Sequence, residues 1–340
     1  AWGLQAIWVV PAVISGFVIN CYLVATRLQA ASHASRALTL IEFLAQGVRQ
    51  HAQILRTLGA AIVLFCFTFY VASQFQAAGT AISAALPIGQ ELAILIGALI
   101  VIAYVFLGGF WAASVTDAIQ GVMMLAVALV LPIAALISVG GFGAMIDGLS
   151  QLEAPELMAW VDQPNLFWAA VFVAGLFGIG LGYPGQPHVV NRFMALKSPK
   201  EIRLGRALAL GWAAVIYSGM VLLGWCGRIL MPELANGESI LLVLSVDLLP
   251  AVLGGVVTGG VLAAIMSTAD SQLLVAGSAV SHDIRGGRSA LMIDRVVIAI
   301  LGALAVMLAV FFPASIFERV LFAWQVMGNG FGPLLLVLLW

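Results

Sequence analysis

The stretch Leu262-Ala-Ala-Ile-Met-Ser-Thr-Ala-Asp-Ser-Gln-Leu-Leu274 places three hydroxyls, a carboxylate and an amide inside a strongly apolar run. Ser267, Asp270 and Ser271 follow helical i, i+3, i+4 spacing, so they share one face of a helix. An ionised Asp at bilayer depth costs roughly 2.5–3.5 kcal/mol and normally faces protein or a water-filled path. Hydroxyls alone would fit ordinary membrane-helix packing. With the carboxylate added, this oxygen-rich face favours a site for a hard cation.

The composition is that of a membrane protein. The 340 residues are 63% hydrophobic and 9% charged, with a mean hydropathy of +1.13. Apolar runs of about 20 residues match a hydrocarbon core about 30 Å thick, which predicts an all-α polytopic membrane protein. The net charge of −1 and the lack of a basic face give no sign of nucleic-acid binding. The three cysteines lie in apolar runs and are interpreted as packing residues.

The hydropathy pattern predicts one transmembrane domain, residues 1–340, with nine spans. Short amphipathic interfacial helices are expected in the segment 38–56. The loop 141–164 is acidic and amphipathic and is expected outside, and a short apolar helix at 240–249 is expected against the outer surface before Pro250. The expected spans are 4–26, 56–78, 92–111, 116–140, 165–183, 206–230, 250–280, 291–312 and 317–340.

The basic residues predict the orientation. The loops 27–56, 184–206 and 281–295 hold 12 of the 14 lysines and arginines, whereas the loops 79–91 and 141–164 hold none. Positive loops stay in the cytoplasm, so residue 1 is expected outside and residue 340 inside a plasma (inner) membrane. Arg192 and its basic neighbours up to Arg206 are interpreted as cytoplasmic anchors. The sequence begins without a signal peptide although its first residue is expected outside, so we expect further helices upstream of it.

Two segments rich in glycine and proline predict interruptions of helices. Gly178-Ile-Gly-Leu-Gly-Tyr-Pro-Gly-Gln-Pro187 cannot continue a regular helix, and Gly328-Asn-Gly-Phe-Gly-Pro333 is expected to kink the last span. Irregular backbone at membrane depth is tolerated where it is buried or lines a cavity, so the first break is a candidate solute site. It is equally compatible with close packing and a helix end at the cytoplasmic face.

Asp117 follows Ser114 and Thr116 at the expected start of the fourth span. It is interpreted either as an acidic residue that complements a helix N-terminus or as a carboxylate at the inner mouth of a cation path. The sequence favours neither reading.

Three motifs carry a family resemblance. Leu107-Gly-Gly-Phe-Trp-Ala-Ala-Ser-Val-Thr-Asp-Ala-Ile-Gln120 resembles a Gly-Gly-Phe…Thr-Asp…Gln motif of the sodium/solute symporters. Gly182-Tyr-Pro-Gly-Gln-Pro-His-Val-Val-Asn-Arg-Phe-Met-Ala195 resembles a block of the family's bacterial sodium/proline branch, and Ala263–Leu274 is similar to its cation-binding helix. The motifs occur in order, and the resemblance runs from about residue 2 to the end.

The resemblance implies a fold of two inverted five-helix repeats of the leucine-transporter type. The nine spans would be core helices two to ten. The first core helix and the C-terminal helices are then expected to lie outside this sequence.

The resemblance also implies site residues. Ser267 and Thr268 match sodium-ligand hydroxyls, and Ala264 matches a backbone-carbonyl ligand. Asp117 matches an aspartate needed for sodium use near the inner exit, while Asp270 and Ser271 match a second cation site in some relatives. The solute residues implied by the proline branch are Tyr70, Tyr183 and Pro187.

Departures from the pattern concern the solute pocket. Ile179 stands where the proline carriers have Trp, and Pro184 stands where they have Phe. Gln325 and Asn329, four residues apart in the last span, replace small apolar residues. These changes alter pocket shape and hydrogen bonding, so another amino acid or a small carboxylate is an alternative to proline.

We therefore expect sodium-coupled symport of a small organic solute bound near Tyr70, Tyr183, Gln186 and Trp324, with Pro187, Gln325 and Asn329 as further candidates. The alternatives are the solute-sensing membrane domain of a signalling protein and a proton-coupled carrier or channel using Asp117 and Asp270. No enzyme is expected, because the sequence shows no nucleophile elbow, phosphate loop or nucleotide fingerprint.

Overall fold

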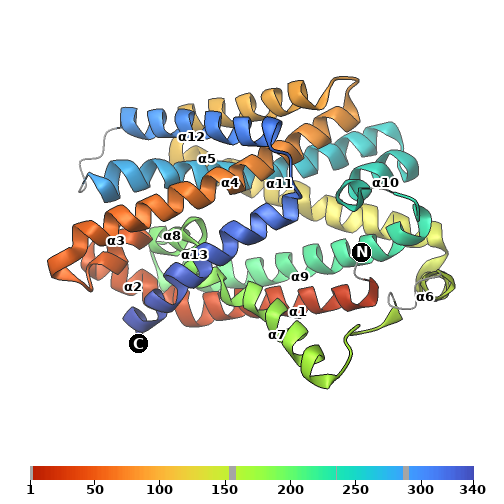
Figure 1. Ribbon diagram of the computed structural model, residues 1–340, viewed down its shortest axis with the longest axis horizontal. Helices are drawn as coiled ribbons and strands as arrows, with labels where there is room; N and C mark the ends of the chain where they lie inside the picture. Colours follow the sequence, from red (N-terminus) through yellow and green to blue (C-terminus); the bar gives the residue numbers. More distant parts are fainter. Residues whose placement is uncertain (1–2, 153–157, 235, 286–290) are drawn as a thin grey trace.

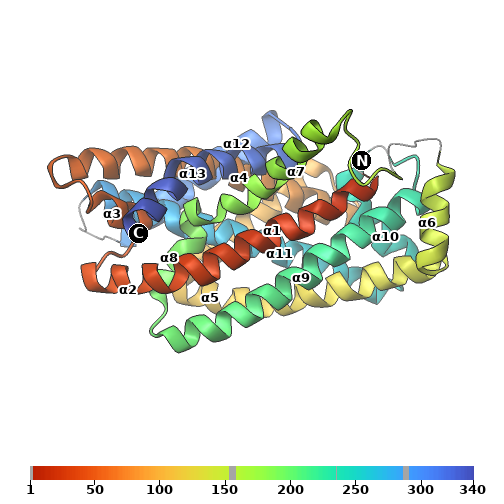
Figure 2. The same cartoon turned by 90° about the horizontal axis from the view of Figure 1, so that it is seen from below.

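The computed structural model describes residues 3–152, 158–234, 236–285 and 291–340, and in these ranges it contains helices and no strand. The helices run along the long axis of the molecule, so their connections gather at its two ends (Figures 1 and 2). One end carries α2 and α3, and the other carries α6 and α10 (Figure 2). The bounds are η1 Gly3–Trp8, α1 Val9–Val18, η2 Ile19–Val24, α2 Ala25–Ser35, α3 Leu40–Ala45, η3 Arg49–His51, α4 Ala52–Ala85, α5 Gln90–Val139, α6 Gly141–Gln151, α7 Leu166–Leu181, η5 Tyr183–Gly185, α8 Pro187–Ala195, α9 Pro199–Leu230, η6 Gly237–Ser239, α10 Ile240–Leu248, α11 Ala251–Ser278, η7 Ala279–Ile284, α12 Leu291–Phe311 and α13 Ile316–Leu339.

Eight helical segments of the described chain are long and apolar enough to cross a membrane, where nine spans were predicted. The predicted spans 92–111 and 116–140 form the single 50-residue helix α5, whose backbone leaves helical geometry at Gly109 (φ 62°, ψ −165°). In Figure 1 the chain turns back here, so both ends of α5 lie at the end of the molecule that carries α6 and α10. Such φ and ψ values are essentially restricted to glycine, which explains how one residue reverses the chain.

The two arms of α5 pack on different helices. Gly97 in the first arm lies against Ala78 and Ile82 of α4, and Gly260 of α11 lies against Val127 in the second arm. Phe67 and Phe75 of α4 are fully buried at the centre of the main core, together with Leu273 of α11. Helix α4 therefore forms the centre against which α5, α11, α12 and α13 are packed.

The two predicted helix interruptions have different outcomes. The first is confirmed, since α7 ends at Leu181 and the turn η5 leads into α8. The second segment, 328–333, lies entirely within α13 with Pro333 inside the helix, and the kink expected there stays a prediction. Pro333 removes only the helix bond to the Asn329 carbonyl, and the glycines allow close contact with η5.

The end of the molecule with α2 and α3 is tied together by charged groups. Glu42 of α3 pairs with His282 of η7 at 2.7 Å and with Arg56 of α4 at 3.2 Å. The Thr39 hydroxyl donates to Asp283 Oδ1 at 2.6 Å. These contacts join α3, α4 and the end of the α11–η7 helix. The predicted short helices of the first basic loop are therefore structural connectors as well as surface elements.

Candidate functional site

Three oxygens predicted to bind sodium lie together on α11. The hydroxyls of Ser267 and Thr268 both donate to the Ala264 carbonyl oxygen, at 3.2 and 2.9 Å. Each hydroxyl keeps lone pairs after donating its proton, so both can also serve as cation ligands. Both side chains are half-buried. The helix thus presents two hydroxyl oxygens and a carbonyl oxygen within one turn.

Asp270 is fully buried one turn further along α11. The Tyr104 hydroxyl donates to Asp270 Oδ2 at 2.6 Å and lies 3.1 Å from the Met266 carbonyl oxygen. Ser271 Oγ lies 3.0 Å from Asp270 Oδ1 and 2.8 Å from the Ser267 carbonyl oxygen. The carboxylate is therefore held from α5 and from its own helix, as a buried polar group requires.

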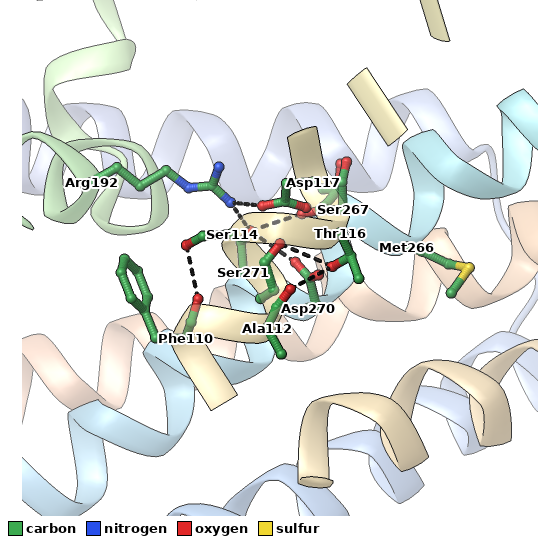
Figure 3. Close-up of polar contacts among 12 residues, drawn as sticks. Phe110, Ala112, Ser114, Thr116, Asp117, Arg192, Met266, Ser267, Asp270 and Ser271 are labelled. Atoms are coloured by element: carbon green, nitrogen blue, oxygen red, sulfur yellow. Dashed lines mark hydrogen bonds and ion pairs between the residues drawn. The ribbon is translucent and has the colours of Figure 1, made fainter. Parts of the chain in front are cut away.

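Asp117 in the second arm of α5 faces the same cluster (Figure 3). Arg192 of α8 donates from Nη2 to Asp117 Oδ2 at 2.5 Å, and the same nitrogen donates to Ser271 Oγ. The other Asp117 oxygen, Oδ1, is buried without a hydrogen-bond partner. Helix α5 continues without interruption from Gly109, so Asp117 does not lie in a first turn and the helix-terminus interpretation is wrong.

Arg192 makes contacts that the sequence did not predict. Its interpretation as a cytoplasmic anchor stays a prediction, and its guanidinium reaches into the polar cluster and bridges α5 and α11. The positive-inside pattern counts charges in loops and carries no information on where a long side chain points. Figure 3 shows the guanidinium directed between Asp117 and Ser271.

A cavity of about 730 Å³ adjoins the cluster. It lies between the bend of α5 and the helices α8, α11 and α12, and segment 37–39 closes one side. Arg192 and Ser271 contribute to its wall, whereas Ser267 and Asp270 do not. The guanidinium therefore stands between the buried oxygens and the open space.

An aromatic cluster surrounds the break between α7 and α8. The Tyr183 ring packs edge-on against Trp324 at a centroid distance of 4.7 Å and lies tilted against Phe17 at 4.8 Å. His188 joins the cluster through ring contacts with Trp324 at 6.4 Å and with Tyr70 at 6.2 Å. Tyr70, Tyr183 and Trp324, predicted from distant parts of the sequence, are thus brought together.

Burial, reinforced by the charge of Arg192, lowers the pKa of His188 to about 3. The imidazole is therefore neutral at physiological pH. Its Nδ1 is buried without a hydrogen-bond partner.

Two side chains fix the break against α13. Gln186 Nε2 donates to the carbonyl oxygens of Gly182 at 3.2 Å and Trp324 at 2.9 Å, while its Oε1 is buried and unpaired. Trp324 Nε1 donates to the Ile179 carbonyl oxygen at 2.9 Å. Pro187 begins α8 and is buried. The Ile179 and Gly182 carbonyls also accept from the N–H groups of Gly182 and Gly185, so the side-chain bonds add to backbone bonds at the break and link it to α13.

The main chains of η5 and α13 meet at glycines. A Cβ on Gly185 would lie 2.6 Å from the Met327 carbonyl oxygen, and one on Gly328 would lie 2.9 Å from Gly182 Cα. We call this contact between residues 182–185 and 327–328 the glycine seam. No side chain larger than hydrogen fits at Gly185 or Gly328 without displacing the backbone.

Gln325 and Asn329 lie elsewhere. Both are exposed on α13, and within the described residues no hydrogen bond joins either amide to the aromatic cluster. The residues that sequence reasoning missed are Tyr104, Tyr217 and His188, which complete the two clusters; the Tyr217 hydroxyl lies 3.4 Å from that of Tyr183. A tyrosine isolated in an apolar run was the one available signal for Tyr104 and Tyr217.

Helices long and apolar enough to cross a membrane, one of them broken beside aromatic rings and another carrying buried oxygens, are the arrangement expected of an ion-coupled transporter. Comparison with known proteins agrees with this class. The model of the sodium:solute symporter family matches residues 1–340. A sodium/proline symporter of Staphylococcus aureus is 33% identical over 356 aligned residues, covering 99% of this chain and 68% of the relative, and the strain JH9 protein gives the same values.

Among solved structures, a Na⁺-coupled sialic acid symporter in a substrate-bound outward-open state matches with a TM-score of 0.73 and 19% identity, covering 98% of this chain and 75% of that one. This likeness shows a shared fold. The chain belongs to the sodium:solute symporter family. It is a multi-pass membrane transporter that uses sodium and a small-molecule solute, and it is not an enzyme.

Proposed function

We propose that this protein couples the inward movement of sodium to the uptake of an amino acid, with proline as the first candidate, by alternating access. The observation that carries the proposal is the group of α11 oxygens from Ala264, Ser267 and Thr268, which is followed one turn later by the buried Asp270. Hydroxyl, carbonyl and carboxylate oxygens are the ligands that hard cations prefer.

Two cation sites are proposed. The first uses Ala264, Ser267 and Thr268. The second uses Asp117, Asp270 and Ser271, and it doubles as an exit path because Ser271 borders the 730 Å³ cavity. In the proposed orientation, residue 1 lies outside and residue 340 inside, so this cavity opens to the cytoplasm. The membrane potential then contributes about 2.3 kcal/mol per entering charge per 100 mV.

The solute is proposed to bind beside the break, between Tyr70, Tyr183, Gln186 and Trp324. The rings offer an apolar wall, and Gln186 keeps one buried, unpaired oxygen. Pro187 fixes the start of α8 next to this site. The 33% identity to a sodium/proline symporter supports proline, whereas Ile179 and Pro184 depart from that branch and leave other amino acids as candidates.

The turn at Gly109 supports a fold in which the arms of α5 cross the membrane separately. With the other seven segments this gives nine crossings, which we propose are helices of two inverted five-helix repeats. The exposed amides of Gln325 and Asn329 remain candidates for contact with a solute in another conformation.

Uptake of labelled proline into vesicles, with sodium or choline outside, tests the proposal in wild type and the double variant Ser267→Ala/Thr268→Ala. Thr258→Ala is the matched control, because Thr258 makes the same type of bond, to the Gly254 carbonyl, on the same helix. We expect the double variant to raise the half-saturating sodium concentration about tenfold or more, since a loss of about 1.4 kcal/mol is a tenfold change.

A rate of uptake that depends on pH and is the same with sodium or choline outside would contradict sodium coupling. It would point to Asp117 and Asp270 as proton carriers. Solute binding without uptake would point to a sensor. Sodium-dependent uptake of another amino acid, in a panel used after proline, would retain the mechanism and replace the solute.

A further inference from the structure

The guanidinium of Arg192 occupies the place between two ligands of the proposed second cation site. Its Nη2 is 2.5 Å from Asp117 Oδ2 and also donates to Ser271 Oγ. These oxygens come from α5 and α11, whereas Arg192 comes from α8 (Figure 3). One nitrogen of a fixed positive group thus takes two oxygen contacts that a sodium ion would use.

A guanidinium and a sodium ion cannot share these oxygens at contact distance, because like charges repel strongly in a poorly solvated site. We propose that Arg192 is a tethered competitor of sodium, which fills the second cation site when the ion is absent and is displaced when the ion binds. The inference rests on the proposed function, since it takes Asp117 and Ser271 as cation ligands.

The position of Arg192 relative to the cavity agrees with displacement. Its side chain is 46% exposed and borders the cavity together with Ser271, whereas Asp117 is 11% exposed behind it. An ion passing between the buried oxygens and the cavity has to move the guanidinium aside. The cavity provides the space into which the side chain can swing.

Helix α8 connects this competitor to the solute site. Arg192 lies six residues after Gln186, in the second half of a nine-residue helix that begins directly after the break. The middle of α8 is held by Asn191 Oδ1, which accepts from the Leu40 N–H at 2.9 Å, and the residue that follows α8 is held by Gln29, which donates to the Leu196 carbonyl at 3.1 Å. A shift of the break on solute binding would therefore change the position from which Arg192 reaches Asp117.

A purely structural ion pair predicts the opposite effect of mutation. If Arg192 only holds α8 in place, its removal should loosen the site and weaken sodium binding. If it competes with sodium, removal should strengthen binding. A guanidinium that fills the site nine-tenths of the time reduces apparent affinity about tenfold, so its loss should lower the half-saturating sodium concentration by about that factor.

Equilibrium binding of ²²Na⁺ to the purified, reconstituted protein measures the sodium affinity and does not require transport. Arg192→Gln is compared with Arg192→Lys, which keeps a competing charge, and with Arg203→Gln, an exposed arginine on α9. We expect Arg192→Gln alone to bind sodium about tenfold more tightly. In an Asp117→Asn background the gain should disappear, because the shared ligand is missing and the two effects are not additive.

A second measurement uses the unmodified protein and does not depend on the folding of a variant. Phenylglyoxal labels accessible arginines, and peptide mass spectrometry reports each one. Sodium should increase labelling of Arg192 several-fold relative to choline and leave Arg203 unchanged.

Unchanged or weaker sodium binding in folded Arg192→Gln would overturn the proposal, as would labelling of Arg192 that sodium leaves unchanged or reduces. Absence of sodium binding by the wild type would instead contradict the proposed function. The two failures are therefore distinguishable.

Discussion

At the scale of single residues, Trp324 joins the last helix to the broken one. Its indole N–H donates to the Ile179 carbonyl, and its own carbonyl accepts from Gln186. The ring also packs on Tyr183. One side chain therefore fixes the position of an aromatic wall and adds a second donor to a carbonyl that also accepts from the Gly182 N–H.

Trp324→Phe should keep the ring contact and lose the bond to Ile179. The Ile179 carbonyl keeps its bond from the Gly182 N–H, so the variant loses one hydrogen bond, worth about 0.5–1.5 kcal/mol. We expect a lower melting temperature and a solute KM raised several-fold, measured by thermal unfolding and by uptake. Trp111→Phe is the control, because Trp111 is 78% exposed on α5, and it should leave both quantities within error. An unchanged KM in Trp324→Phe would remove Trp324 from the solute site.

The sequence predicted which residues share a helix face and failed for contacts between helices. The grouping of Ser267, Asp270 and Ser271 follows from helical periodicity alone, and the structure shows them linked. Tyr104 and Arg192 reach Asp270 and Ser271 from other elements, so no local pattern points to them. Distant contacts of this kind depend on packing, which the linear sequence does not display.

At the scale of helices, α1 and α7 approach closely at two glycines. A Cβ added to Gly180 would collide with the Ala12 carbonyl oxygen, and one added to Gly16 would collide with Gly180 itself. Close approach at small residues is a common way for membrane helices to associate, since dispersion contacts drive packing in lipid.

Gly180→Ala should therefore push α7 away from α1. Overpacking of this kind costs about 1–3 kcal/mol, and we expect a lower melting temperature with reduced solute affinity. Gly175→Ala is the matched control on the same helix, because a Cβ there meets nothing within 4 Å. Equal stability of the two variants would show that the contact tolerates a methyl group.

Helix-breaking residues were informative only in part. The residues around Pro184 do interrupt the helix, whereas those before Pro333 do not. Gly109 reverses the direction of the chain without a loop, so the predicted spans 92–111 and 116–140 correspond to the two arms of α5 on either side of the bend. Glycine permits a bend or a close contact, and surrounding packing decides between them.

At the scale of the whole molecule, the Glu42 cluster fastens the end that carries α2 and α3. Burial raises the pKa of Glu42, but hydrogen bonds from the Leu38 N–H and from His282, with the charges of His282 and Arg56, outweigh it. The net pKa lies below the ordinary value of 4.5. A carboxyl group with a lowered folded pKa stabilises the fold above its unfolded pKa, and this stabilisation is lost as pH falls through the folded value.

The melting temperature of the wild type should therefore decline as pH drops below 4.5, the ordinary pKa of the glutamate. Glu42→Gln should be less stable at neutral pH and should show a shallower decline under acid. Thermal unfolding between neutral pH and pH about 3.5 measures both. Glu233→Gln replaces an exposed carboxylate and should follow the wild-type curve. Parallel curves for Glu42→Gln and wild type would contradict a stabilising role for the cluster.

Composition was sufficient to predict a helical membrane protein, because long apolar runs permit little else in a bilayer. The sequence placed the two arms of α5 as separate spans, but the bend at Gly109 that joins them without a loop was not predicted. The relative placement of α7, α8 and α13, which creates the aromatic cluster, depends on contacts between residues more than 100 positions apart, such as Gln186 with Trp324.

The glycine seam has a mechanical consequence. Side chains between two helices act as compliant spacers, because they change rotamer and absorb small shifts. At Gly185 and Gly328 no such spacer exists, so main chain bears directly on main chain. A displacement of the broken segment is then transmitted to α13 almost without slack. The segment η5 and the middle of α13 should therefore move together as one rigid body, even where the surrounding helices change position.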